Sequence, residues 1–236
     1  MADTVLEVDG LRAGYGPAEI LFGVSLRLAK GEVAALMGRN GAGKSTTLKA
    51  VMGLLPPRGG RVVFGGREIT GLPAFRIARL GLGYVPEDRR IFTDLTVAEN
   101  LEVGRRAARG HTAWTPERLF AIFPNLAAMR GRRAAAMSGG EQQMLAIART
   151  LMGNPDAVLL DEPSEGLAPV ILELMAEAVL RMKREGIAVL LSEQNFDFAA
   201  AVADHAYVIE RGEIRYDGTM AALEADPALR AQHLTL

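Results

Sequence analysis

The sequence predicts an α/β protein in which helices flank a mainly parallel β-sheet. Two observations support this fold class: short apolar runs alternate with helical segments, and a glycine-rich loop joins the first run to a helix. The apolar runs are Val33 to Met37, Leu82 to Val85, Ala157 to Leu160 and Ile187 to Leu191. Uninterrupted runs of this length are typical of strands that are buried on both faces.

Short segments with alternating apolar and polar residues predict an antiparallel β layer beside the main sheet. They occur within the first 30 residues and within residues 60–69, for example at Val24 to Leu28 and at Arg61 to Phe64. The second segment is followed by Gly65-Gly66, which is typical of a turn.

Residues 96–150 follow a helical pattern. Breaks in this pattern are expected at Gly110, Pro116, Pro124 and Gly131 to Arg133. We therefore expect a single domain over residues 1–236, with a helical subdomain at about residues 88–155 inserted in the core. A chain of 236 residues is long enough for one such core with a smaller lobe, and too short for two.

The glycine-rich loop fits GxxxxGK[ST] and predicts a phosphate-binding site in a phosphate-loop NTPase core. It consists of Gly38, Arg39, Asn40, Gly41, Ala42, Gly43, Lys44 and Ser45, and Thr46 continues into the helix-forming segment. Glycines allow successive N–H groups to turn towards phosphate oxygens at the start of a helix. We expect Lys44 to contact the outer phosphates and the Ser45 hydroxyl to ligate Mg²⁺.

The third apolar run ends in two carboxylates, Asp161 and Glu162. In phosphate-loop proteins such a strand lies next to the loop, so we assign Asp161 to Mg²⁺ and Glu162 to the attacking water. Without the loop, a strand that simply enters a turn at Pro163-Ser164 would be the favoured interpretation of this pattern.

Ser138, Gly139 and Gly140 open a helix that continues through Met144 to Leu151. Ser138 and Glu141 form the pattern of a capping box, which is sufficient to explain a helix start. The two glycines exceed what a cap requires and would let a phosphate approach the helix end. Two such helix starts in one chain suggest that ATP is held between two subunits.

Composition excludes several classes of protein. The net charge is −1, and arginines at 105, 106, 109, 130, 132 and 133 are interleaved with Glu99, Glu102 and Glu117. We interpret this cluster as a solvated helical face rather than a nucleic-acid site, because no row of stacking aromatics accompanies it.

No run of 18 apolar residues occurs, and Met1 to Glu7 lacks the features of an export signal. The absence of cysteine fits a reducing compartment, and we expect the chain to stay in the cytosol.

The ordered set of Tyr15, GRNGAGKST, SGGEQQ, LLDEP and Ser192-Glu193-Gln194 resembles the ATP-binding cassette (ABC) family over almost the whole chain. The resemblance implies an ATPase and a head-to-tail dimer, in which Ser138 and Gly140 of one subunit contact the γ-phosphate held by Lys44 of the other. It also implies that Tyr15 stacks on adenine, although a surface aromatic of the β layer remains the alternative.

Residues 83–92, 164–169 and 193–195 are similar to the smaller ATP-binding subunit of branched-chain amino acid importers, and similar sequences serve urea and short-chain amide importers. Three residues depart from the wider family: Glu87 replaces Gln, Ala168 replaces Asp and Gln194 replaces His. Glu87 can ligate Mg²⁺ directly or through water. Gln194 can donate to the γ-phosphate but cannot carry a proton, so the role of base falls to Glu162.

The resemblance implies a peripheral subunit on the cytoplasmic face of the bacterial inner membrane. Its partners would be a second ABC ATP-binding subunit, in a heterodimer or a homodimer, two integral-membrane permeases and, indirectly, a solute-binding protein. Residues 87–100 would receive the permeases, although Ile91, Phe92, Leu95 and Val97 would equally serve as core of the lobe. The alternatives are a soluble ABC ATPase, for example in cluster assembly, and a small-molecule kinase.

Overall fold

The computed structural model describes residues 3–108 and 113–233, so Met1, Ala2, Arg109 and the predicted break at Gly110 lie outside the described residues. The strands are β1 (Thr4–Tyr15), β2 (Ala18–Ala29), β3 (Val33–Met37), β4 (Gly59–Phe64), β5 (Arg67–Glu68), β6 (Leu82–Val85), β7 (Ala157–Asp161), β8 (Ala188–Glu193), β9 (His205–Glu210) and β10 (Glu213–Thr219). The α-helices are α1 (Lys44–Val51), α2 (Ala74–Leu80), α3 (Val97–Gly104), α4 (Pro116–Ile122), α5 (Pro124–Ala128), α6 (Gly139–Leu151), α7 (Pro169–Arg184), α8 (Phe196–Val202), α9 (Met220–Glu224) and α10 (Pro227–His233), and Ala134–Ala136 form a 3₁₀ turn.

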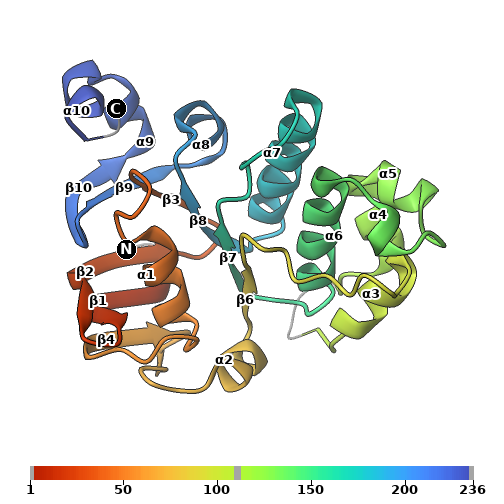
Figure 1. Ribbon diagram of the computed structural model, residues 1–236, viewed down its shortest axis with the longest axis horizontal. Helices are drawn as coiled ribbons and strands as arrows, with labels where there is room; N and C mark the ends of the chain where they lie inside the picture. Colours follow the sequence, from red (N-terminus) through yellow and green to blue (C-terminus); the bar gives the residue numbers. More distant parts are fainter. Residues whose placement is uncertain (1–2, 109–112, 234–236) are drawn as a thin grey trace.

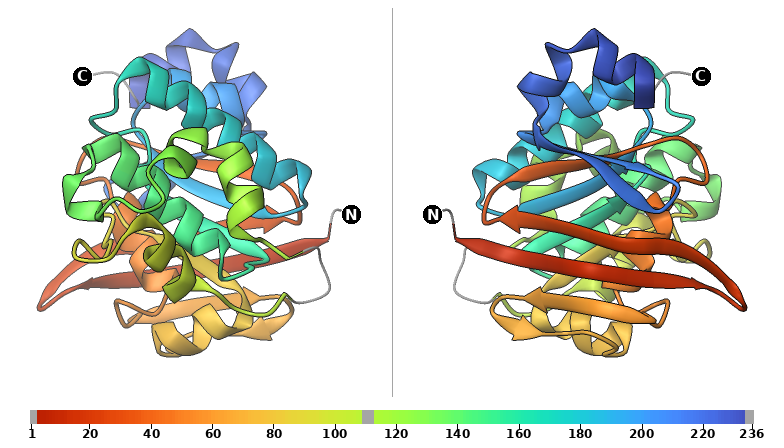
Figure 2. Two further views of the ribbon diagram at one scale, coloured as in Figure 1. Left: turned by 90° about the vertical axis from the view of Figure 1, so that its right-hand side faces the viewer. Right: turned by 90° about the vertical axis from the view of Figure 1, so that its left-hand side faces the viewer.

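Within the described residues the strands form two sheets, which confirms the predicted α/β class. The larger sheet has the order β10-β9-β3-β8-β7-β6 and is parallel except for the β9–β10 pair. The smaller sheet, β2-β1-β4-β5, is antiparallel. Helices α3 to α6 all lie in the connection between β6 and β7. Figure 2 shows these helices on one side of the molecule and the long strands β1 and β2 on the other.

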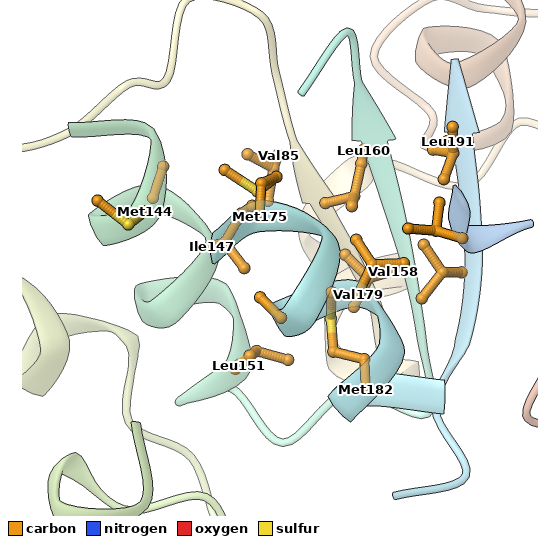
Figure 3. Packing of buried hydrophobic residues seen from close by; sticks show 14 of the residues in the cluster. Val85, Met144, Ile147, Leu151, Val158, Leu160, Met175, Val179, Met182 and Leu191 are labelled. Atoms are coloured by element: carbon orange, nitrogen blue, oxygen red, sulfur yellow. The ribbon is translucent and has the colours of Figure 1, made fainter. Parts of the chain in front are cut away.

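Side chains of the parallel strands alternate between two hydrophobic cores, which explains why the strands are apolar throughout. In β7, Val158 and Leu160 pack in one core with α6 and α7, whereas Ala157 and Leu159 pack in the other, which also contains side chains of β1, β2 and α1. Figure 3 shows Val158 and Leu160 directed towards side chains of α6 and α7. Polar residues are therefore excluded until the strands reach their carboxyl ends.

Several elements differ from their predicted bounds. The strands β7 and β8 extend to Asp161 and Glu193, one and two residues beyond the predicted apolar runs, because parallel pairing continues through these polar residues. The first two strands are 12 residues long rather than short, with register shifts where they pair. Pro116 and Pro124 begin helices, where a missing N–H costs nothing.

The strands that lead to the loop and to the acidic turn are not direct neighbours in the larger sheet. The acidic strand β7 is not hydrogen-bonded to the loop strand β3, because β8 lies between them. The turn after β7 nevertheless reaches the loop, because Glu162 Oε1 lies 3.1 Å from Lys44 Nζ. Among the residues that the structure describes, no helix has the length and apolarity needed to span a membrane.

We expect the core around α6 to dominate the stability of the fold. Ile147 is fully buried against this core, so Ile147→Ala should lower the free energy of unfolding by about 2–5 kcal/mol. Val170→Ala is the control, because Val170 is 63% exposed, and should change this value by less than about 0.5 kcal/mol. Denaturant unfolding measures both, and equal losses in the two variants would contradict the assignment of the core.

Candidate functional site

The glycine-rich loop joins β3 to α1 through a backbone that needs glycine. Gly41 and Gly43 have φ angles of 76° and 116°, a range that disfavours residues with a Cβ. A Cβ at Gly38 would lie 2.5 Å from the carbonyl oxygen of Ile209, so the approach of β9 also requires glycine. Gly43 is the N-cap of α1, and the loop therefore ends at the positive end of this helix.

Lys44 is the first residue of α1 and is only 4% exposed. Its Nζ donates to the carbonyl oxygens of Gly38 at 2.8 Å and Arg39 at 3.1 Å. It also forms an ion pair with Glu162 Oε1 at 3.1 Å. An ammonium group has three donors, so these contacts satisfy it and connect the loop to the turn after β7.

Asp161 is 1% exposed, and hydrogen bonds hold both of its carboxylate oxygens. Ser192 Oγ donates to Oδ1 at 2.7 Å, and the Tyr84 hydroxyl donates to Oδ2 at 3.0 Å. Burial, followed by the nearby Asp161 charge, raises the pKa of Tyr84, so this hydroxyl stays protonated as a donor. Asp161 is thus fixed in orientation by side chains of both neighbouring strands.

Glu162 has a φ angle of 46°, which is unusual for a residue with a side chain. Its backbone N–H donates to the carbonyl oxygen and to Oγ of Ser192, each at 3.1 Å. Its Oε2 accepts from Gln194 Nε2 at 3.1 Å, and the same amide donates to Asn40 Oδ1 at 2.6 Å. Lys44, Glu162, Gln194 and Asn40 therefore form one polar network that spans three loops.

A cavity of about 480 Å³ opens over this network. Its lining includes residues 40, 41 and 43–46 of the loop region together with Tyr15, Ile20, Glu87, Glu162 and Glu165. Tyr15 is 49% exposed, so its ring is accessible at the rim. The Ala42 side chain packs in the hydrophobic core instead, and Asp161 does not line the cavity. Ala42 can therefore contribute only its backbone.

Three carboxylates, those of Glu87, Glu162 and Glu165, line this cavity. Burial, followed by repulsion from Glu165, Glu162 and Asp161, raises the pKa of Glu87. Ligands that carry positive charge would relieve this repulsion. Among residues 3–108 and 113–233, no group of three or more His, Cys, Asp or Glu side chains is arranged to hold a metal ion. A cation here would need further ligands, such as a hydroxyl or a phosphate oxygen.

Ser138, Gly139 and Gly140 lie away from this cavity, at the start of α6 in the helical subdomain. Figure 1 shows α6 separated from α1 by the strands β6 and β7. The capping box is present: Ser138 Oγ accepts from the Glu141 N–H at 3.4 Å, and Glu141 Oε2 accepts from the Ser138 N–H at 2.7 Å. Within one chain, the two helix starts therefore do not share a site.

Tyr84 and Ser192 orient Asp161, a role that the sequence motifs containing them did not predict. Tyr84 is in β6 and Ser192 is in β8, 77 and 31 residues from Asp161. Only the alignment of these parallel strands brings the three side chains together. A polar residue near the carboxyl end of a buried strand was the available signal in both cases.

The fold and this loop define a phosphate-loop nucleotide-binding protein. Residues 21–165 match the ABC transporter family. The chain is also 42% identical, over 98% of its length and 99% of the relative's, to the high-affinity branched-chain amino acid transport ATP-binding protein BraG of Pseudomonas aeruginosa. The chain therefore belongs to the ABC transporter family and is an ATP-hydrolysing subunit of this family.

Other relatives and a solved structure agree with this assignment. The chain is 37% identical to the probable branched-chain amino acid transport ATP-binding protein LivF of Archaeoglobus fulgidus, with 89% of each chain covered. It is 32% identical to the lipopolysaccharide export system ATP-binding protein LptB of Haemophilus influenzae, with 98% and 97% covered. The ADP conformation of MJ1267, an ATP-binding cassette of an ABC transporter, superposes with a TM-score of 0.80 at 28% identity, with 96% of each chain covered.

Lys44→Ala should weaken nucleotide binding because it removes the buried cation of the loop. Loss of a charged hydrogen-bond donor predicts a Kd that rises by about 10- to 100-fold, measured by titration with a fluorescent ATP analogue. Lys30→Ala is the matched control, because Lys30 is an exposed lysine at the β2–β3 turn. Unchanged affinity in Lys44→Ala would show that this ammonium group does not bind phosphate.

Proposed function

We propose that this chain is the ATP-binding and ATP-hydrolysing subunit of a bacterial importer for branched-chain amino acids or a related small polar solute, such as urea or an amide. The observation that carries this proposal is the identity with BraG, which extends over nearly the whole of both chains. The similarity to LivF supports the same class of solute. We also infer that residues 1–236 form one ABC domain, with the helical subdomain at about 88–155.

In the proposed reaction, Glu162 is the general base and Lys44 and Gln194 assist it. The position of the Glu162 carboxylate at the cavity, between the Lys44 ammonium and the Gln194 amide, supports this role. When ATP binds, its outer phosphates compete for the Lys44 ammonium, and the Glu162 carboxylate becomes available to accept a proton from the attacking water. The NH₂ group of Gln194 would then donate to the γ-phosphate, but this neutral amide cannot carry the proton.

Tyr15 is assigned to adenine, and the loop residues 38–46 are assigned to the phosphates. The exposed ring at the rim of the cavity supports the first assignment, and the glycine backbone angles support the second. Mg²⁺ would be held by Ser45, Glu87 and Asp161, and when bound it would neutralise charge on the phosphates. The raised pKa of Glu87 supports a cation at this position. Asp161 does not line the cavity and accepts from Tyr84 and Ser192, so it would act on the ion through the other ligands of its coordination shell.

The working form is proposed to be a dimer with a second ABC ATP-binding subunit, in a heterodimer or a homodimer. Ser138 and Gly139 are exposed at the start of α6 and do not line the cavity of their own chain. This exposure supports a role for Ser138, Gly139 and Gly140 in contacting ATP held by the other subunit. Backbone N–H groups at a helix start are well suited to that contact.

Two membrane permeases, and through them a solute-binding protein, are the proposed remaining partners, with this chain on the cytoplasmic face of the inner membrane. Within residues 87–100, Phe92 is 48% exposed, whereas Val97 is fully buried and belongs to the core of the subdomain. Phe92 lines a cavity of about 290 Å³ together with Tyr84, Val103 and Arg149. This partly apolar surface supports docking of a permease segment at Phe92 rather than at Val97.

Glu162→Gln should abolish turnover while preserving ATP binding, since an amide keeps the shape of the side chain but cannot accept the proton. Loss of a general base predicts a kcat that falls by at least about 100-fold, with nucleotide affinity retained and the closed dimer favoured. Phosphate release, nucleotide titration and size-exclusion chromatography measure these quantities. Glu165→Gln, which alters another carboxylate at the same cavity, is the control, and unchanged turnover in Glu162→Gln would remove it as the base.

Co-purification through a tag on this chain, from native membranes, tests the transport role. We expect two multi-spanning permeases, a second ABC subunit and a solute-binding protein specific for a small polar solute, identified by mass spectrometry. Recovery of lipopolysaccharide export components instead would favour the activity named for LptB. A soluble assembly without permeases would overturn the transport proposal while leaving the ATP site intact.

A further inference from the structure

A buried carboxylate that the proposed mechanism does not use lies at the end of β8, beside the turn that carries Glu162. This carboxylate belongs to Glu193, which is 2% exposed. Its Oε1 accepts from the Ser164 N–H at 2.9 Å, and its Oε2 accepts from Ser164 Oγ at 2.8 Å. Oε2 also accepts from the backbone N–H groups of Gln194 and Asn195, each at 3.2 Å. One side chain therefore receives four hydrogen bonds from two separate turns.

These hydrogen bonds tie the turn after β7 to the turn after β8. The neighbours of Glu193 act on the same turn, because Ser192 contacts Asp161 and Glu162, and Gln194 contacts Glu162. Three consecutive side chains at the end of β8 thus hold residues 161, 162 and 164. Glu193 joins the backbone of the turn after β7, at Ser164, to the backbone after β8, at Gln194 and Asn195.

The turn needs such support because of its backbone conformation. Glu162 has a left-handed φ angle of 46°, and residues with a side chain keep this conformation only where their surroundings enforce it. The N–H of Glu162 is held by Ser192, and two residues later both the N–H and the hydroxyl of Ser164 are held by Glu193. The backbone at Glu162 is therefore held by Ser192 at its own N–H and by Glu193 two residues later.

The chemistry of the donors explains why a carboxylate occupies this position. All four partners are N–H or O–H donors, so the site needs four acceptor positions and no donor, which an ionised carboxylate supplies and an amide does not. Burial raises the pKa of Glu193, whereas the hydrogen bonds from Ser164, Asn195 and Gln194 act in the opposite direction and favour its ionised form. An apolar residue would fill the same space and leave the Ser164 N–H and hydroxyl unpaired.

We propose that Glu193 is a positioning residue for ATP hydrolysis, which holds the turn of residues 161–164 and the Gln194 backbone so that Glu162 faces the attacking water. This inference rests on the proposed role of Glu162. Glu193 is buried and does not line the cavity over the loop, so it would act through Glu162 and Gln194 rather than on the nucleotide. Its removal should therefore change the chemical step and leave nucleotide binding by the loop in place.

The test compares Glu193→Gln and Glu193→Ala in the complex that co-purifies with the full chain. Glutamine keeps one acceptor oxygen, and we expect its kcat to fall about 10-fold, whereas alanine loses all four hydrogen bonds and its kcat should fall about 100-fold, as for other displaced catalytic groups. The Kd for a fluorescent ATP analogue should stay within about twofold of the native value in both variants, because the phosphate loop is untouched. Unchanged kcat in Glu193→Ala overturns the proposal, and so does an equal loss of kcat and affinity, which indicates a structural role alone.

Ser164→Ala provides a matched partner, since it deletes only the hydroxyl that contacts Glu193. Its effect on kcat should be smaller than that of Glu193→Ala and should not add to it in the double variant. Full additivity would show that the two residues act independently and would overturn the positioning role.

A measurement without turnover separates this proposal from the role assigned to Glu162. Hydrogen exchange of the full chain should become faster at residues 162–166 in Glu193→Ala, because the Ser164 N–H loses its acceptor. If Glu162→Gln keeps normal turnover, the base assignment fails, and exchange alone then decides whether Glu193 holds the turn. Unchanged exchange at residues 162–166 overturns the inference whatever the result for Glu162.

Discussion

The parallel pairing of β3, β8 and β7 is the constraint on which the site depends. In this pairing Met37 aligns with Glu193, and Ser192 aligns with Asp161. Because parallel strands end on the same edge of a sheet, the loop after β3 and the turns after β7 and β8 meet there. A register shift of one residue would reverse the side chains of β8, exchanging those that face the two cores.

Several carboxylates lie at this edge of the sheet, and most of the groups that contact them are neutral hydrogen-bond donors. Asp161 and Glu193 are buried and are held by neutral hydroxyl and N–H donors, whereas Glu162 shares an ion pair with the buried Lys44. Hydrogen bonds to a carboxylate favour its ionised form and offset part of the cost of burial. The Lys44–Glu162 ion pair differs from these hydrogen bonds. A phosphate group would carry more negative charge than the Glu162 carboxylate and would compete with it for the Lys44 ammonium group.

Local patterns in the sequence predicted the elements that are defined by neighbouring residues. The run Val33 to Met37 and the following loop were recognisable because strand burial, glycine conformation and the helix start are all encoded within 20 residues. The capping box at Ser138 was predictable for the same reason. The roles of these residues in binding ATP stay predictions, since they depend on a nucleotide and on a second subunit.

Contacts between distant residues could not be predicted in this way. The placement of β8 between β3 and β7, and the contacts of Tyr84 and Ser192 with Asp161, depend on strand order, which one sequence does not specify. The β9–β10 hairpin likewise extends the sheet without an apolar run as uniform as those of the parallel strands. The edge strand β10 carries several polar residues, so composition marks it less clearly.

Tyr84 connects the two regions of the molecule for which different partners are proposed. Its hydroxyl donates to Asp161 at the edge of the sheet, and the same residue lines the cavity that contains Phe92 and Arg149. Arg149 lies over the Phe92 ring at 5.1 Å and donates to the carbonyl oxygens of Arg89 and Arg90, so the wall of this cavity is continuous with the segment after Glu87. A displacement of the Tyr84 ring from that side would change the hydrogen bond that Asp161 receives. The two regions therefore share the side chain of Tyr84.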